Sequence, residues 1–167
     1  MNERNDLDSA GSEKHQHLAF VTKDEVLAIG VLYIKEIIEY AVITKVPQMQ
    51  RFIKGVTNIR GNVIPVVDLS DRLGLGSCEI DRRTCVISVE VKDGEDSLEI
   101  GLLVDAVNDV HDIFPSETED APSFGARIRK DFIRHMGKVD GKLIAVLHLE
   151  NLLNIAEISK ATHQTDL

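Results

Sequence analysis

Aromatic residues and cysteines are scarce in this sequence. Aromatic side chains make up 4% of the 167 residues, and Trp is absent. A hydrophobic core must therefore be built mainly from Val, Ile and Leu. Two cysteines occur, Cys78 and Cys85, and they lack the number and spacing of a disulfide framework. Their scarcity favours a reducing compartment, and we expect a cytoplasmic protein.

The sequence also lacks long hydrophobic runs and an excess of positive charge. No apolar segment approaches the ~20 residues needed to cross a bilayer, and the polar N-terminus has no signal-peptide core. The formal net charge is −9, whereas nucleic-acid binding needs clustered Lys and Arg that neutralise phosphates. The same charge disfavours an anionic membrane surface. We therefore expect no nucleic-acid partner and no direct membrane insertion.

Motifs that carry catalysis are missing as well. The sequence contains no GxxxxGK[ST] phosphate loop, no GxGxxG, no HExxH and no GxSxG. His15 and His17 stand close together, but two histidines in a predicted tail rarely bind a metal. The other histidines are scattered, at His111, His135, His148 and His163. The sequence predicts a protein that is not an enzyme, with no cofactor and no metal.

What the sequence does contain is a series of short runs rich in Val, Ile and Leu, separated by turn residues. Such a pattern, with only short helical segments, is typical of an all-β barrel or sandwich. Segment 31–43 could be helical by propensity, but its many β-branched residues favour a strand. Asp140-Gly141 predicts a hairpin turn. Further strands are predicted at 18–21, 26–29, 84–91, 98–107 and 143–149, and a short helix at 150–155.

The stretch 47–75 organises these elements. Pro47 suits the first turn of a short helix that Gly55 would end. Segment 56–60 is predicted to be extended, with Gly61-Asn62 as a two-residue turn.

The next run, 63–67, is rich in β-branched residues and predicts the second strand of this hairpin. Pro65 within it lacks a ladder donor, which indicates an edge strand or a bulge. Asp68 or Ser70 would cap the helix that follows.

This stretch carries a resemblance to a known family. FIKGVTNIRGNVIPVVDL, at 52–69, resembles the signature of CheW-like domains, close to FIxGxxNxRGxxxPVxDL. AIGVLYIKEII, IGLLVDAVNDV and KLIAVLHLENLL resemble the family's first-barrel segment, a later strand, and its final strand and helix. Two positions depart from the pattern, because His148 and Val31 stand where an acidic residue is usual. These departures concern local hydrogen bonding.

The resemblance implies two SH3-like five-stranded β-barrel subdomains side by side, with short helices and a hydrophobic seam. It implies that the last segment completes the barrel that the early residues begin. The domain would cover 17–155, flanked by a disordered tail at 1–16 and a C-terminal tail at 156–167.

The resemblance also implies a function. Family members are non-catalytic adaptors that couple the cytoplasmic tips of methyl-accepting chemoreceptors to the regulatory domain of a CheA-type histidine kinase. This chain would then be cytoplasmic and recruited to membrane receptor arrays. Two alternatives stay open: a CheW-like scaffold of another signalling array, such as surface motility or biofilm control, and an unrelated small-molecule-binding or enzymatic β-barrel.

Site residues are implied position by position. Partner binding would involve Ile34 and Glu36 on the KxxEI-like strand, Asn58 and Arg60 in the NxRG segment, and Val104 in the IGLLVDAV strand. Between Val104 and Val107, core burial is expected for at least one. Gly55, Gly61, Pro65 and Asp68 are expected to serve backbone turns or helix capping instead of partner contacts.

Overall fold

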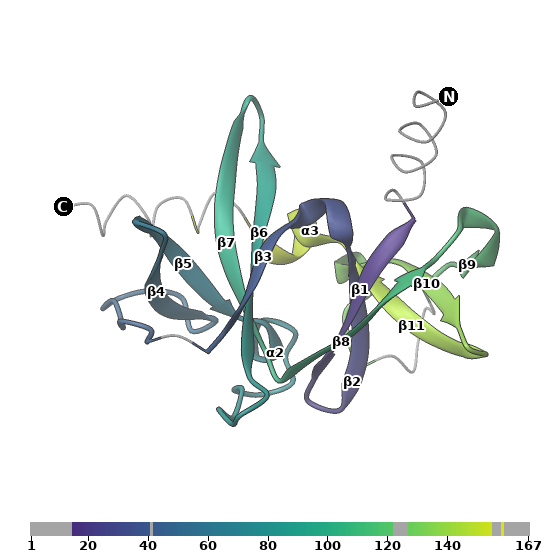
Figure 1. Ribbon diagram of the computed structural model, residues 1–167, viewed down its shortest axis with the longest axis horizontal. Coiled ribbons are helices and arrows are strands. Elements are labelled where there is room, and N and C mark those ends of the chain that lie inside the picture. The colour runs from purple at the N-terminus through teal and green to yellow at the C-terminus, as the bar shows by residue number, and fades with distance from the viewer. Residues whose placement is uncertain (1–14, 41, 122–126, 155–157, 159–167) are drawn as a thin grey trace.

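The structure is a computed structural model that describes residues 15–40, 42–121, 127–154 and 158. These residues form two β-sheets connected by short helices (Figure 1). The strands are β1 (Gln16–Thr22), β2 (Glu25–Gly30), β3 (Ile34–Glu39), β4 (Ile53–Ile59), β5 (Asn62–Asp68), β6 (Cys85–Asp93), β7 (Asp96–Val104), β8 (Ala106–Asp112), β9 (Thr118–Glu119), β10 (Ile133–Val139) and β11 (Lys142–Leu147). The helices are α2 (Leu69–Arg72), α3 (Leu149–Leu153) and the 3-10 turns η1 (Val31–Tyr33), η2 (Pro115–Glu117) and η3 (Lys130–Phe132).

The two sheets lie side by side, as the family resemblance implies (Figure 1). The first barrel has the strand order β8-β1-β2-β11-β10, extended by the short β9, and the second has the order β3-β6-β7-β5-β4. An isolated bridge between Thr44 and Val56 ties the segment after β3 to β4 and so closes the second barrel. The expected pair of SH3-like barrels is confirmed.

Each barrel is assembled from both halves of the chain. The first barrel combines β1 and β2 with β8, β10 and β11, and the second combines β3, β4 and β5 with β6 and β7. The parallel pairings make the exchange visible, because β11 pairs with β2 and β5 pairs with β7. Segments 59–73 and 139–153 correspond, since each holds a hairpin turn, a strand and a capped helix. The late segment therefore does complete the barrel begun by the early residues.

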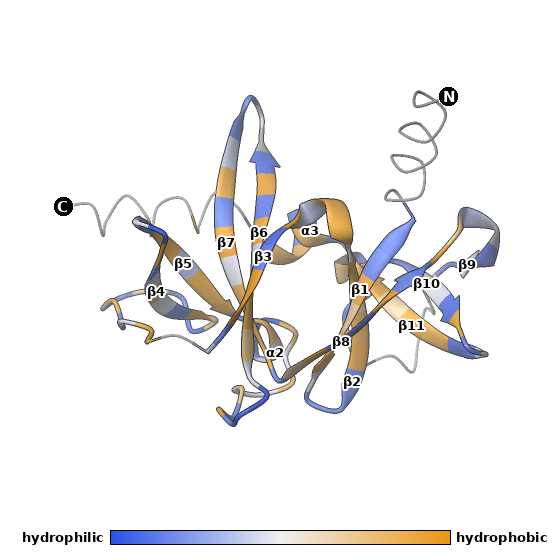
Figure 2. Ribbon diagram, viewed as in Figure 1, coloured by the Kyte–Doolittle hydropathy of each residue, from blue (hydrophilic) through white to orange (hydrophobic). Residues whose placement is uncertain are grey.

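The core is built from aliphatic side chains, with a few Phe rings. Alternate residues of β6 serve two different cores: Val86 packs inside the second barrel, whereas Ile87 and Val89 belong to a larger cluster shared by both barrels. That cluster includes Phe20 and Leu27 of the first barrel. Helix α3 lies between the two sheets (Figure 2), and its three leucines, Leu149, Leu152 and Leu153, are buried in this cluster. The hydrophobic seam expected between the barrels is therefore present.

Arg72 at the end of α2 spans this seam. Its guanidinium carbon lies 4.6 Å from the ring centre of Phe52 and 5.1 Å from that of Phe132. Its Nε donates a hydrogen bond of 2.5 Å to the carbonyl of Leu152 in α3. Since Leu152 follows a strand of the first barrel, this contact joins the two barrels through one side chain.

The hairpin turns agree with the sequence in one case and differ by one residue in another. Asp140 and Gly141 both have positive φ (51° and 78°), as a type I′ turn requires, so this prediction is confirmed. In the β4–β5 hairpin the turn residues are Arg60 and Gly61 (φ 53° and 84°), because Ile59 pairs with Asn62. The predicted Gly61-Asn62 turn was therefore misplaced by one residue.

Two further predictions for the stretch 47–68 were wrong. Pro47 begins no helix: the chain between the Thr44 bridge and Ile53 forms turns, with Gln48 at φ 64°. Gly55 lies inside β4, next to a β-bulge, instead of ending a helix.

Pro65 was predicted to mark an edge strand or a bulge. Strand β5 is not an edge strand, because it lies between β4 and β7, and the β-bulge of this hairpin lies in β4, between Ile53 and Gly55. Pro65 has no backbone N–H, but no hydrogen bond of the β4–β5 ladder is lost for that reason. Val56, which pairs with Pro65, directs its N–H and C=O to Thr44. Pairing with β7 begins only at Val66.

Helices α2 and α3 are capped in the same way, by the side chain of the residue before the helix. Asp68 caps α2 by accepting a hydrogen bond from the Asp71 N–H, which confirms the capping prediction. His148, where the family pattern has an acidic residue, caps α3 in the same way: its Nδ1 accepts from the Asn151 N–H at 3.3 Å. The departure from the family pattern therefore preserves the cap.

Two further expectations concern the ends of segments. The predicted strand 31–43 is divided into the 3-10 turn η1 and β3. The predicted tails, 1–16 and 156–167, fall mostly outside the described residues. Within the second of them, Ile158 is fully buried in the shared core, so this residue packs against the domain.

Candidate partner-binding site

Glu36 and Arg60 form an ion pair on the second barrel. Arg60 stands at the tip of the β4–β5 hairpin and Glu36 on β3, and Arg60 Nη2 lies 3.1 Å from Glu36 Oε2. The arginine side chain is 82% exposed, whereas the glutamate is 22% exposed. The pair therefore presents a solvent-facing cation that is anchored by a half-buried carboxylate.

Glu36 belongs to a wider charged cluster, defined here as Lys35, Glu36, Arg60 and Glu99. Glu36 is the cross-strand partner of Ser88, so the two side chains share a face of the sheet. Ser88 Oγ donates to Glu99 Oε1 at 2.7 Å, and Lys35 Nζ lies 3.6 Å from Glu99 Oε2. The cluster combines two cations with two carboxylates, so it can offer a partner either sign of charge.

Asn58 and Gly61 hold the turn that presents Arg60. Asn58 Oδ1 accepts a 2.9 Å hydrogen bond from the Gly61 N–H. Gly61 adopts φ 84°, and an added Cβ there would meet nothing within 4 Å. The side chain of Asn58 therefore has a structural partner in the turn, in addition to being exposed beside Arg60.

An exposed aliphatic side chain lies next to the Arg60 turn. Val63 is 50% exposed and pairs with Asn58. Ile37 on β3 is 43% exposed, but it follows Glu36 directly, so the two side chains point to opposite faces of the sheet. The exposure of Val63 could not be predicted from the sequence, because every residue of 63–67 is apolar and no alternation separates the two faces of the strand. Arg60, Glu36 and Val63 together form a mixed surface of charge and aliphatic area.

Two predicted contact residues, Val104 and Ile34, are fully or partly buried. Val104 is fully buried and pairs with Cys85, so it cannot touch a partner, and its assignment to partner binding was wrong. Ile34 is half-buried and packs against the shared core. Its contribution to a partner surface would be through the backbone of β3 and the part of its side chain that remains accessible.

Asp68, predicted as a structural residue, is 1% exposed and organises the connection between β5 and β6. Besides capping α2, it accepts a hydrogen bond from the Cys78 N–H at 3.0 Å. Cys78 Sγ in turn donates to Asp105 Oδ1 at 3.0 Å. Burial, reinforced by this bond and by the charge of Asp105, raises the pKa of the Cys78 thiol. Cys78 is thus a structural thiol.

The described residues show neither a metal centre nor a spanning helix. Across 15–40, 42–121, 127–154 and 158, no group of three or more His, Cys, Asp or Glu side chains could hold a metal ion. No helix in that same part of the chain is long and apolar enough to cross a membrane.

Comparison with known proteins gives a consistent result. A family model described as the CheW-like domain matches residues 16–157. The chain is 30% identical to "Chemotaxis protein CheW" of Rhizobium meliloti (strain 1021), with 81% of this chain and 84% of that protein covered. It is 32% identical to "Chemotaxis protein CheW" of Bacillus subtilis (strain 168), with 82% and 85% covered.

A solved structure is also similar. The crystal structure of scaffolding protein TtCheW from Thermoanaerobacter tengcongensis has a TM-score of 0.74 and 30% sequence identity, and covers 83% of this chain and 87% of that one. The similarity therefore extends over both barrels.

Proposed function

The chain belongs to the CheW-like domain family, and from this premise we propose that it is a non-catalytic adaptor of chemotaxis signalling. It would couple the cytoplasmic tips of chemoreceptors to the regulatory domain of a CheA-type histidine kinase. It would act in the cytoplasm, recruited to membrane receptor arrays. The observation that carries the proposal is the ion pair between Glu36 and the exposed Arg60, at the family's KxxEI and NxRG positions.

The receptor would dock on the second barrel, around Arg60. The guanidinium is held by one carboxylate and keeps other N–H groups directed to solvent, a geometry suited to a carboxylate of the partner. Val63, which pairs with Asn58 next to the turn, would add apolar contact area beside it. Because the pair is exposed, it would determine orientation and specificity more than overall affinity.

The kinase domain would dock elsewhere, on the first barrel. Val110 on β8 and Leu143 on β11 are 51% and 50% exposed. Strand β8 pairs only with β1 among the described strands, so its other edge can accept contacts from a partner backbone. Separate surfaces on separate barrels would allow both partners to bind at once. We do not assign any turnover to either surface.

The test is a titration of each partner, with and without the other. Arg60→Glu should weaken binding of a receptor tip by about tenfold or more and leave the kinase regulatory domain nearly unaffected. Leu143→Asp should show the reverse pattern. Arg127→Glu is the matched control, because Arg127 forms a similar exposed ion pair with Glu25 on the first barrel.

Three results would contradict the proposal. Displacement of the receptor by saturating kinase domain would indicate one shared surface and a competitor in place of an adaptor. An equal effect of Arg60→Glu and Arg127→Glu would show that receptor binding depends on overall charge. Binding of neither partner, with capture of components of another signalling system, would favour the alternative of a different CheW-like array.

A further inference from the structure

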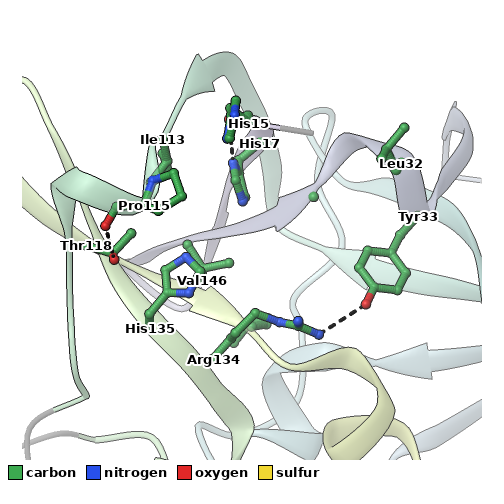
Figure 3. A pocket seen from close by; sticks show the side chains of 12 residues that line it. His15, His17, Leu32, Tyr33, Ile113, Pro115, Thr118, Arg134, His135 and Val146 are labelled. Carbon is green, nitrogen blue, oxygen red and sulfur yellow. Dashed lines mark hydrogen bonds between the residues drawn. The ribbon is translucent and has the colours of Figure 1, made fainter. Parts of the chain in front are cut away.

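A cavity of about 370 Å³ opens in the first barrel, between β1, η1 and β10 (Figure 3). We call it the histidine pocket, because His15, His17, His135 and Arg134 contribute its polar lining. Aliphatic side chains such as Ile113 and Val146 line the remainder. None of the described Asp or Glu residues is among those that line it. In a chain of net charge −9, this concentration of basic groups is unusual.

His17 is oriented by its own strand. Its Nδ1 lies 2.8 Å from the carbonyl oxygen of His15, which can only accept, so Nδ1 carries a proton. The Nε2 atom is therefore left as the group that can interact within the pocket. The ring of His135 faces it edge-on, with ring centres 6.4 Å apart. Two imidazole rings therefore lie close together in the pocket, and the Nε2 atom of His17 is available to a ligand.

Arg134 supplies a permanent positive charge at the same place. Its Nη2 donates to the Tyr33 hydroxyl at 3.1 Å and lies 3.4 Å from Glu150 Oε2. The Tyr33 hydroxyl donates to Glu150 Oε1 at 2.6 Å. Among the described residues, only Nη2 of the guanidinium has a hydrogen-bond partner. The remaining N–H groups can serve a ligand.

We propose that the histidine pocket binds a small organic carboxylate, with the carboxylate among Arg134, His17 and His135 and an apolar body against Ile113 and Val146. The basic lining requires an anion. The mostly aliphatic remainder requires an apolar body, and the volume lies in the range of about 300–1,000 Å³ found for small-molecule sites. A phosphate dianion fits less well, because Arg134 shares its charge with Glu150. A cation would meet the permanent positive charge of Arg134.

The protonation state of the pocket makes this binding depend on pH. Burial lowers the pKa of His17 and of His135, and the charge of Arg134 lowers both further. Other groups face the pair: His15 before β1, His111 across from His17 on β8, Tyr33 on η1, and Glu150 on α3 through Arg134. A bound carboxylate stabilises the imidazolium form. Binding should therefore take up protons and become tighter as pH falls.

The experiment is a two-dimensional ¹H–¹⁵N NMR titration of the full chain with benzoate, with uncharged benzamide as the matched ligand. We expect saturable shifts confined to the pocket amides, such as Gly30 and Thr118, and a Kd on the order of 1 mM. Benzamide should bind about tenfold more weakly or not at all. From pH 7.5 to 5.5 the benzoate affinity should rise by several-fold to about tenfold, with no change for benzamide.

Variants make the assignment specific. Arg134→Gln and His17→Gln should each weaken benzoate by about tenfold, whereas Arg127→Gln, at an exposed position of the same barrel, should not. The amide spectra report whether each variant is folded, and the pH dependence of the unmodified chain needs no variant. Shifts scattered over the surface, equal binding of benzamide, or an affinity independent of pH would each overturn the proposal. It does not depend on the adaptor function.

Discussion

Gly55 offers a sharp test of how the second barrel is closed. Gly55 lies in β4 with φ +153°, and a Cβ added there would stand 2.2 Å from the carbonyl oxygen of Thr44 and 2.8 Å from its carbonyl carbon. These are backbone atoms, so no side chain can rotate away. Gly55→Ala must therefore displace the segment that follows β3. Gly61→Ala is the matched control, because Gly61 also has positive φ but open space around it.

The expected costs can be worked out from these contacts. Displacing Thr44 breaks two backbone hydrogen bonds with Val56, of 2.8 and 2.9 Å, each contributing about 1 kcal/mol. Strain from a Cβ at positive φ adds about 1–2 kcal/mol. Gly55→Ala should therefore destabilise the domain by about 3–4 kcal/mol. Gly61→Ala should cost only the strain, about 1–2 kcal/mol.

Urea unfolding followed by far-UV circular dichroism measures both free energies. Because the Thr44 bridge holds β3 against β4, Gly55→Ala should also weaken receptor-tip binding in variants that remain folded, by loosening the geometry between Glu36 and Arg60. Equal costs for the two glycine variants would refute the reasoning. That result would mean that the Thr44–Val56 bridge does not contribute to barrel closure.

Three further predictions follow from individual contacts. Asp68→Ala should destabilise by about 2–3 kcal/mol, since it removes a cap and leaves the buried Cys78 N–H unpaired, whereas His148→Ala should cost about 0.5–1 kcal/mol; urea midpoints decide. Arg72→Lys should cost about 1–2 kcal/mol in the same assay, because an ammonium cannot reproduce the planar stacking across the seam. Iodoacetamide should label the half-buried Cys85 before Cys78, which should react only on unfolding. Burial raises the pKa of both thiols, so labelling of either should accelerate as pH rises.

Local signals in the sequence predicted the strands and helices better than the exact positions of the turns that connect them. Asp140-Gly141 was recognised as a turn because both residues tolerate positive φ and apolar runs flank them. In the other hairpin the Gly61-Asn62 dipeptide gave an equally good local signal. The hydrogen bond from Gly61 to Asn58 places the turn one residue earlier, on Arg60. A register of this kind depends on a specific side-chain contact that composition does not encode.

The remaining errors arise from contacts between segments distant in the chain. Gly55 was interpreted as a helix end, because nothing near it in the sequence indicates that the backbone of Thr44 approaches it. Val104 could not be distinguished from a surface valine, since β7 is apolar on both faces. The family resemblance assigned both Glu36 and Arg60 to partner binding, but periodicity alone would not have brought the two residues together. The histidine pocket was missed for the same reason, as His17 and His135 come from opposite halves.

The exchange of strands between halves explains why such contacts matter for the proposed function. Glu36 and Arg60 both belong to the first half, but the strands β6 and β7 that support them come from the second half. Neither barrel can form its sheet without the other half of the chain. The buried cluster shared by the barrels, and Arg72 across the seam, then hold the two outer surfaces in one orientation. An adaptor that must keep two partners in a defined geometry requires such a fixed relation between its binding surfaces, which two barrels joined only by a flexible linker would not provide.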